Sequence, residues 1–482
     1  MTLKTKNMQI RVILSSSIVF AASIIMILMK ENLQDTDFIT WCVLLSLAVF
    51  IYEIYNICKI TGEIFTPSIL FLAAFYVFQN GQLLLVALGI DFYMFYINTL
   101  NSLTCDVTLF TGISNMCAGL AGVVVAKITS KRNYHMHRAD KYNPKSVSNA
   151  AILGILVTGS TAIPLLLIKF FGYALSGGYY AVRDFEGRLP AIIGLMEYLF
   201  VPFCFLYLVF SQNKYSRRGI TFLSGVWFLL TALCGDRTTG VSGLLMLAYL
   251  GYVMKQDKKN KHQGAVKLIV VGLLLIVFIK VAYAFRMQTG IVEAIFRLGH
   301  TFVGFLSELG FSCFPLFMMM NIVPDLEPFQ YGKQYLLSII AGVVPSTLDL
   351  TGYITKYTSG WRIYDEWIYR YYSQYDFGVG FSLNAEAYIN FGWFGIIAIF
   401  MLCAIVILYL SENTTSRYGI YKVVVLMFIW FTLPRRSSYY IWNGIFWCVF
   451  IIGLYLRLMC TSHKHYTDKI NNVHANTGTP KC

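Results

Sequence analysis

The stretch IRVILSSSIVFAASIIMILM, residues 10–29, decides the class of fold. It is predominantly apolar, and as a helix it reaches about 30 Å, which is the thickness of the hydrocarbon core of a bilayer. Comparable runs follow along the chain, at 38–57, 67–89, 106–126, 148–168, 191–211, 219–235, 239–254, 268–285, 392–411, 422–433 and 441–458. The sequence therefore predicts an all-α, polytopic bundle of transmembrane helices.

The composition excludes a water-soluble protein. Of the 482 residues, 57% are hydrophobic and only 13% are charged, whereas about 25% of a soluble chain is charged. The runs are also too long and too uniformly apolar for the alternating strands of a transmembrane β-barrel. The net charge of +14 comes mainly from loops on one side of the predicted membrane. Its distribution therefore reflects the orientation of the chain in the membrane and gives no indication of a nucleic-acid partner.

The distribution of lysine and arginine orients the chain. With the N-terminus inside, the basic segments 127–145 and 255–267 and the basic tail 459–482 all fall on the cytoplasmic side. We expect spans one to nine in 1–285, a long periplasmic loop in 286–391 and the last three spans in 392–458. Within that loop, 300–320 and 335–348 are apolar enough for two further spans or a hairpin at the interface, which gives twelve to fourteen spans in all.

Arginines gather on the outer side, where orientation rules disfavour positive charge. They are Arg183, Arg188, Arg237, Arg286, Arg297, Arg362, Arg370, Arg435 and Arg436. Because a guanidinium binds phosphate or carboxylate with two parallel hydrogen bonds, this excess predicts an anionic ligand on the outer face. The alternative is that they pair with acids of the same loops or reach lipid headgroups.

Two short turns carry arginines at the membrane edge. Arg237 lies in CGDRTTG, 234–240, and Arg435 and Arg436 lie in PRRSSYY, 434–440. A charge held so close to hydrocarbon is costly and usually functional. We expect these arginines, with Arg286 and Arg297, to bind a diphosphate, although Asp236 offers Arg237 a simple ion-pair partner.

A polar helix is expected just before the tenth span, in GVGFSLNAEAYINFGWFG, 378–395. At helical spacing, Asn384 and Tyr388 share one face, and Glu386 and Asn390 share another. Amides, a phenol and a carboxylate suit sugar hydroxyls, so Asn384, Tyr388 and Asn390 are the predicted sugar ligands. The alternative is a glycine-terminated loop that leads into an interfacial aromatic belt.

The third candidate stretch is RLGHTFVGFLSELG, 297–310. Hydropathy makes Glu308 the most buried of the candidate acids, and an acid in an apolar run is a site candidate by default. Glu308, Glu386 and His300 are the predicted catalytic groups: Glu308 ranks first as the base, Glu386 second as a ligand of sugar hydroxyls, and His300 third. The alternative for Glu308 is a structural pair with a nearby arginine. The sequence has no metal-ligand or nucleotide motif, so we expect no metal and no cofactor.

Three stretches carry a family resemblance: GDRTTG at 235–240, FLSELGFS at 305–312 running on to YGKQYL at 331–336, and FSLNAEAYINFG at 381–392. With the whole hydropathy plan, they resemble the Wzy-type polymerases of O-antigen and capsular polysaccharide. The resemblance implies a metal-independent glycosyltransferase of the bacterial inner membrane. Its donor and acceptor would both be oligosaccharide repeat units linked to undecaprenyl diphosphate, with a chain-length regulator and a flippase as further partners.

Two alternatives stay open at this point. An O-antigen ligase, which transfers glycan to a lipid A core, is chemically close and differs in its acceptor. A polysaccharide flippase or an ion-coupled transporter is a different class. Transporters are expected to show inverted repeats and ionisable groups near mid-membrane, whereas the ionisable groups of this chain crowd the outer rim.

Overall fold

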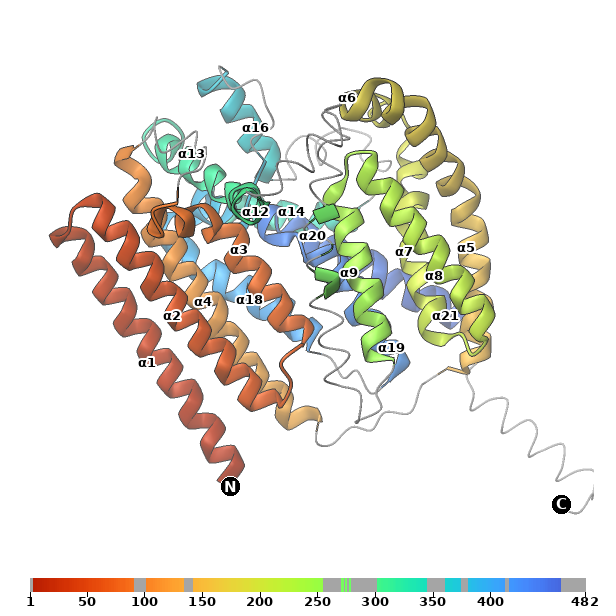
Figure 1. Cartoon of the computed structure of the whole chain (residues 1–482), viewed down its shortest axis with the longest axis horizontal. Coiled ribbons are helices and arrows are strands. Elements are labelled where there is room, and N and C mark those ends of the chain that lie inside the picture. Colours follow the sequence, from red (N-terminus) through yellow and green to blue (C-terminus); the bar gives the residue numbers. More distant parts are fainter. Residues whose placement is uncertain are drawn as a thin grey trace, which may run out of the picture. The chain divides into compact units, whose positions relative to one another are not determined.

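The computed structural model of the chain describes residues 3–90, 101–133, 142–254, 270–272, 274, 277–278, 301–344, 360–373, 380–411 and 416–460. Within these ranges the regular structure is helical and contains no strand (Figure 1). The prediction of an all-α fold is therefore confirmed.

Ten helices of the described chain are long and apolar enough to cross a bilayer. They are Lys6–Asn32, Asp35–Thr61, Pro67–Ala87, Leu103–Ser130, Pro144–Ala174, Ile192–Phe210, Val303–Ile322, Leu383–Leu410, Arg417–Arg435 and Tyr439–Met459. The chain is thus a multi-pass membrane protein.

Several predicted spans differ from these ten. The segments 219–235 and 239–254 correspond to α8 (Lys214–Leu233) and α9 (Arg237–Val253), a packed helical pair that is not among the ten. The cations in the first turn of α8 shorten its apolar stretch, and α9 has only 17 residues. The segment 268–285 lies mostly outside the described residues, which include only 270–272, 274 and 277–278 of it.

The stretch predicted as a long outer loop contains regular helices. Val303–Ile322 is apolar and long enough to cross a bilayer. This agrees with the first of the two alternatives for 300–320, a further span. By contrast α14 (Lys333–Val343) has 11 residues, about 16 Å of helix, which is too short for the hydrocarbon core. The tenth span also begins earlier than predicted, because α17 (Leu383–Phe391) runs into α18 (Gly395–Leu410) through the short helix η6 (Gly392–Phe394).

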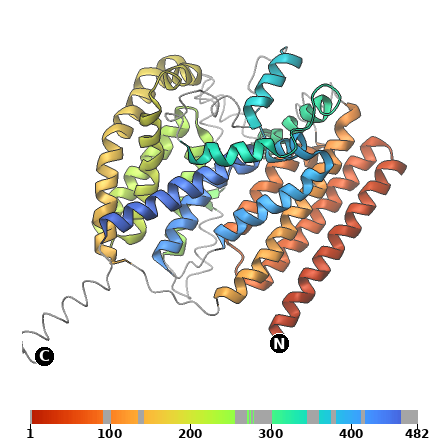
Figure 2. The same cartoon turned by 180° about the vertical axis from the view of Figure 1, so that it is seen from behind.

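The chain divides into two compact units, each described by itself. The first unit is drawn from Met1–His135, Val292–Glu412 and Leu426–Gly444. Its core is formed by α1 (Leu3–Asn32), α2 (Asp35–Thr61), α3 (Pro67–Ala87) and α4 (Asn101–Asn133). Figures 1 and 2 show α1, α2 and α4 side by side from opposite directions, in red to orange.

The helices of the first unit that follow residue 300 pack against this core. α12 (Thr301–Gly310) packs on α3, and α18 packs on α4. The remaining elements are η4 (Phe311–Cys313), α13 (Phe314–Ile322), α14, α16 (Gly360–Tyr371), α17, η6, the end of α19 (Arg417–Trp430), η7 (Leu433–Arg435) and α20 (Tyr439–Asn443).

The second unit is drawn from Met136–Ile291, Asn413–Val425 and Ile445–Cys482. Its main pairs are α5 (Pro144–Leu167) with α7 (Ala191–Phe210), and α8 with α9. It also contains η1 (Ile168–Ala174), α6 (Leu175–Glu186), the start of α19, η8 (Gly444–Ile451) and α21 (Ile452–Met459).

Candidate functional site

The centre of the candidate site is α17 in the first unit. The Ser382 hydroxyl caps the helix by accepting a hydrogen bond from the Ala385 amide at 3.2 Å. Serine is a favoured N-cap because its short side chain satisfies a free amide of the first turn. The helix ends at Gly392, whose positive φ of 56° favours glycine. The predicted polar helix is therefore present, and all ten residues 381–390 are buried.

Glu386 connects α17 to the turn that carries two of the predicted arginines. Its side chain is 0% exposed. One carboxylate oxygen accepts a hydrogen bond from the Ser438 amide at 2.7 Å, and the other accepts one from the Ser438 hydroxyl at 2.9 Å. The segments 378–395 and 434–440, which are far apart in the sequence, are thus joined at Glu386.

The turn at residues 434–440, called the arginine turn below, is ordered by several contacts within the first unit. Arg436 lies over the ring of Tyr440, with the guanidinium carbon 4.5 Å from the ring centroid. The Tyr440 carbonyl accepts a hydrogen bond from the indole of Trp430 at 3.0 Å. The Nε atom of Arg435 would lie 3.9 Å from a Cβ built on Gly380, just before α17. The Arg435 side chain therefore lies near the start of α17, and the Arg436 guanidinium lies on the ring of Tyr440 in α20.

The three predicted sugar ligands differ in what their polar groups already contact. The Tyr388 hydroxyl donates to the Val323 carbonyl at 3.4 Å. The Asn390 amide donates to the Glu386 carbonyl at 2.7 Å and accepts from the Gln334 amide at 3.4 Å. The Asn384 side chain is 0% exposed, and its amide has no hydrogen-bond partner within the described chain. Of the three, Asn384 is the one with unused hydrogen-bonding capacity.

Helix α14 adds polar groups on the side of Glu386. The side-chain amide of Gln334 is buried and has no hydrogen-bond partner within the described ranges, and the hydroxyl of Ser338 is buried beside Glu386. Burial of the Tyr335 hydroxyl raises its pKa well above the usual value, and the nearby charge of Glu386 acts in the same direction. A protonated phenol and the Ser338 hydroxyl therefore lie near the carboxylate.

One turn of α3 ties the site together. The Gln79 side chain donates to the Pro434 carbonyl at 2.7 Å, at the start of the arginine turn. Three residues later, Gln82 donates to the Ser307 carbonyl of α12 at 2.8 Å. Between them, the buried Asn80 amide has no partner among the described residues. The arginine turn and the residue before Glu308 are thus fastened to the same turn of one helix.

The burial of the two candidate acids is the reverse of what hydropathy predicted. Glu308 of α12 is partly exposed, whereas Glu386 is fully buried. α12 meets α3 through two glycines: a Cβ on Gly310 would lie 2.1 Å from the Gln82 amide nitrogen, and one on Gly81 would lie 2.6 Å from the Leu306 carbonyl oxygen. The buried face of α12 is therefore its glycine face, which leaves Glu308 partly accessible.

The other predicted site residues lie elsewhere. His300, Arg286 and Arg297 fall outside the described residues. Arg237 belongs to the second unit, where it is the first residue of α9. Asp236 caps that helix, accepting from the Thr239 amide at 3.1 Å and from the Thr238 hydroxyl at 2.8 Å. Asp236, which the sequence offered as an ion-pair partner of Arg237, therefore also caps α9.

The second unit holds an ionic cluster around a buried lysine, which the site prediction did not include. The Lys169 ammonium pairs with Glu186 at 2.7 Å and with Glu197 at 2.8 Å, and its side chain is only 5% exposed. Lys169 lies in η1, a π-helix that interrupts the α-helical ladder between α5 and α6. A buried ammonium requires such partners because its desolvation is costly.

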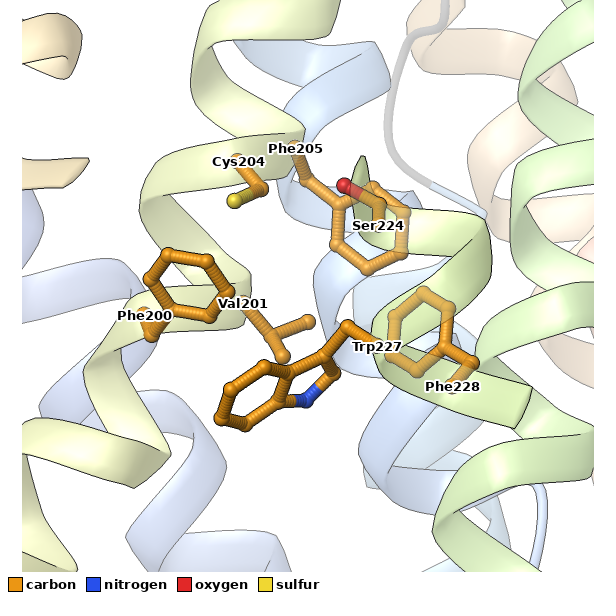
Figure 3. Close-up of a pocket in the computed structure, with 7 residues that line it drawn as sticks. All are labelled: Phe200, Val201, Cys204, Phe205, Ser224, Trp227 and Phe228. Atoms are coloured by element: carbon orange, nitrogen blue, oxygen red, sulfur yellow. The ribbon is translucent and has the colours of Figure 1, made fainter. Parts of the chain in front are cut away.

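A small apolar pocket between α7 and α8 is a gap in helix packing. It is lined by Phe200, Val201, Cys204, Phe205, Ser224, Trp227 and Phe228 (Figure 3). It has no room for a water molecule. Among the described residues, no group of three or more histidine, cysteine, aspartate or glutamate side chains is placed to hold a metal ion.

The sequence prediction missed the polar residues of α3 and α14. Gln79, Asn80 and Gln82 stand together as QNGQ within the apolar run 67–89. A polar cluster inside a span is expensive in lipid and faces the protein interior, so this signal was present. Gln334 lies in YGKQYL, where its burial depends on packing against α17.

Comparison with known proteins identifies a family. The model of the O-antigen polysaccharide polymerase Wzy family matches residues 11–465, which is nearly the whole chain. No curated protein and no solved structure matches the chain.

Proposed function

Since the chain belongs to the O-antigen polysaccharide polymerase Wzy family, we propose that it joins oligosaccharide repeat units carried on undecaprenyl diphosphate into O-antigen or capsular polysaccharide at the periplasmic face of the inner membrane. The observation that carries the proposal is the joint between Glu386 and Ser438. It brings a two-arginine turn next to a buried polar helix, and these are the groups that a diphosphate and a sugar require.

The proposed reaction is one glycosyl transfer. A hydroxyl oxygen of the acceptor sugar attacks the anomeric carbon of the donor, the bond from that carbon to the diphosphate oxygen breaks, and undecaprenyl diphosphate leaves. The acceptor proton goes to a base. Arg435 and Arg436 would stabilise the charge on the departing diphosphate, an electrostatic role that requires no metal ion.

Residue roles follow from accessibility and free hydrogen-bonding capacity. Glu308 takes the role of base because its carboxylate is partly exposed beside the same turn of α3 that holds the arginine turn. His300 remains the second candidate for this role. Asn384 offers its unpaired amide to sugar hydroxyls. Arg237, Arg286 and Arg297 are proposed as additional diphosphate ligands on the strength of the sequence pattern.

The test is product length. The purified protein, supplied with lipid-linked single repeat units as the only substrate, should form a ladder of longer lipid-linked chains, also in the presence of EDTA. A ligase would require a lipid A core acceptor and would add one block to it. A flippase would move the lipid across a vesicle membrane without lengthening it. Absence of a ladder from folded protein would refute the proposal.

The charge type of the arginines gives a sharper test. Arg435→Lys, Arg436→Lys and Arg237→Lys should each lose most polymer at normal protein level, because a point charge cannot reproduce a bidentate grip on a diphosphate. The matched control is Arg218→Lys, an exposed arginine at the start of α8, which should be silent. Glu308→Gln should accumulate single repeats, and near-normal polymer would move the role of base to His300.

A further inference from the structure

We infer that Glu386 is a positioning residue that acts through Ser438 to hold the arginine turn in place, and that it neither removes the acceptor proton nor binds sugar. This inference rests on the proposed function, because it assumes that Arg435 and Arg436 bind the diphosphate. The geometry of the carboxylate and of the turn carries it.

Both oxygens of the carboxylate are hydrogen-bonded. Each of its oxygens accepts a hydrogen bond from Ser438, one from the backbone amide and one from the hydroxyl, at 2.7 and 2.9 Å. The side chain is 0% exposed. A base must come within about 2.6–3.2 Å of the acceptor hydroxyl, and a sugar ligand needs a polar group that is still unpaired, as the Asn384 side-chain amide is among the described residues. Glu386 offers neither, because its surface is covered and its oxygens are occupied.

The arginine turn is anchored on both sides. Pro434 precedes the two arginines, and its carbonyl is held by Gln79 of α3 at 2.7 Å. Ser438 follows them, and Glu386 holds it. Arg435 and Arg436 are therefore two of the three residues between these fixed points. This geometry restricts where their guanidiniums reach, and preorganised charge is what stabilises a departing diphosphate.

The anchor at Ser438 extends to the stacking partner of Arg436. Ser438 is the residue before α20, and Tyr440 lies in the first turn of that helix. The Tyr440 ring supports the Arg436 guanidinium at 4.5 Å. α14 also packs directly on α20, since a Cβ on Gly342 would lie 2.8 Å from the Trp442 Cβ. Loss of the Glu386 contact would thus free both the turn and the ring.

The experiment is a double-mutant cycle on the rate of the first transfer, which forms a two-repeat lipid-linked product. Glu386→Gln keeps the size of the side chain but faces one Ser438 donor with an NH₂ group, so we expect about a tenfold or greater loss. Arg436→Ala removes the positioned group. If Glu386 acts through the turn, the loss in the double variant should be smaller than the product of the two single losses, because part of the Glu386 effect passes through Arg436. The matched control is Glu366→Gln, an exposed carboxylate of α16, which should lose nothing.

A second variant, Ser438→Ala, keeps the inference testable if Glu386→Gln fails to fold. Ser438→Ala removes only the hydroxyl donor and leaves the backbone contact, so it should fold, lose activity to a smaller extent and show the same non-additivity with Arg436→Ala. The residual activity of Glu386→Gln should keep the wild-type pH profile. The inference would be overturned if the rate losses of the two single variants multiply in the double variant. It would also be overturned if the pH profile of the Glu386→Gln rate differs from that of the wild type, or if Ser438→Ala is fully active. A wild-type protein that forms no ladder would instead refute the proposed function.

Discussion

Replacement of Gly310 by alanine tests whether the contact between α12 and α3 places Glu308. A Cβ at this position would lie 2.1 Å from the Gln82 amide nitrogen and 2.6 and 2.7 Å from the backbone carbon atoms of Gly81. These neighbours are helical backbone, which cannot turn aside as a flexible side chain would. To reach ordinary contact at 3.4 Å, the two helices must separate by about 1.3 Å at this point.

The separation should reduce activity more than it reduces stability. Overpacking of this kind typically costs about 1–3 kcal/mol of folding free energy, so the protein should still accumulate in the membrane. However, the same shift stretches the hydrogen bond from Gln82 to Ser307 and moves the adjacent Glu308. A displacement of about 1 Å in a reacting group can cost on the order of a hundredfold in rate.

The assay compares the rate of the first transfer and the thermal unfolding midpoint in detergent for Gly310→Ala and a control. The control is Gly251→Ala in α9, where an added Cβ meets nothing within 4 Å; it should leave the rate unchanged. Wild-type activity in Gly310→Ala would refute the idea that this glycine contact positions Glu308. An equal loss in both variants would point to a general effect of alanine in helices.

Three further predictions concern single contacts. Gln79→Leu leaves the buried Pro434 carbonyl without its donor, which should cost about 1–3 kcal/mol and slow transfer, measured by midpoint and product ladder; an unchanged ladder would count against the anchor at Pro434. Lys169→Met leaves Glu186 and Glu197 without their common cation and should lower the thermal midpoint of the protein strongly. The control Lys145→Met, at an exposed lysine, should leave the midpoint unchanged. Equal midpoints for the two variants would show that the ion pairs of Lys169 add little stability. Ser382→Ala removes the cap of α17 and should destabilise the protein by about 1 kcal/mol, read from the same melting curves, and a midpoint at the wild-type value would contradict this role.

Much of the candidate site could be recognised from local sequence. The helix at 383–391 follows from a capping serine, a regular polar pattern and a terminal glycine, all within a dozen residues. The turn with Arg435 and Arg436 was recognisable because arginines between two apolar runs must lie at the membrane edge. These features depend on neighbours in the chain, so the sequence contains the information directly.

The ranking of the acids was not accessible in the same way. Hydropathy averages over a window, and around Glu308 that window is apolar on every side. Which face of α12 is buried depends on Gly310 meeting Gly81 of α3, a contact across more than two hundred residues of chain. Glu386, in a more polar segment, is the fully buried acid because Ser438 satisfies both of its oxygens.

The sequence by itself thus determined that the protein is a helical, multi-pass membrane protein, which segments are apolar enough to cross, and which polar residues are too costly in lipid to be incidental. These are additive properties of short segments, set by the transfer of side chains from water to hydrocarbon. The tertiary structure decided that Gln79 and Glu386 are hydrogen-bonded to the two ends of the arginine turn, and that Glu308 stays accessible. Those outcomes depend on hydrogen bonds and close backbone contacts between distant segments, whose partners exist only once the helices have packed.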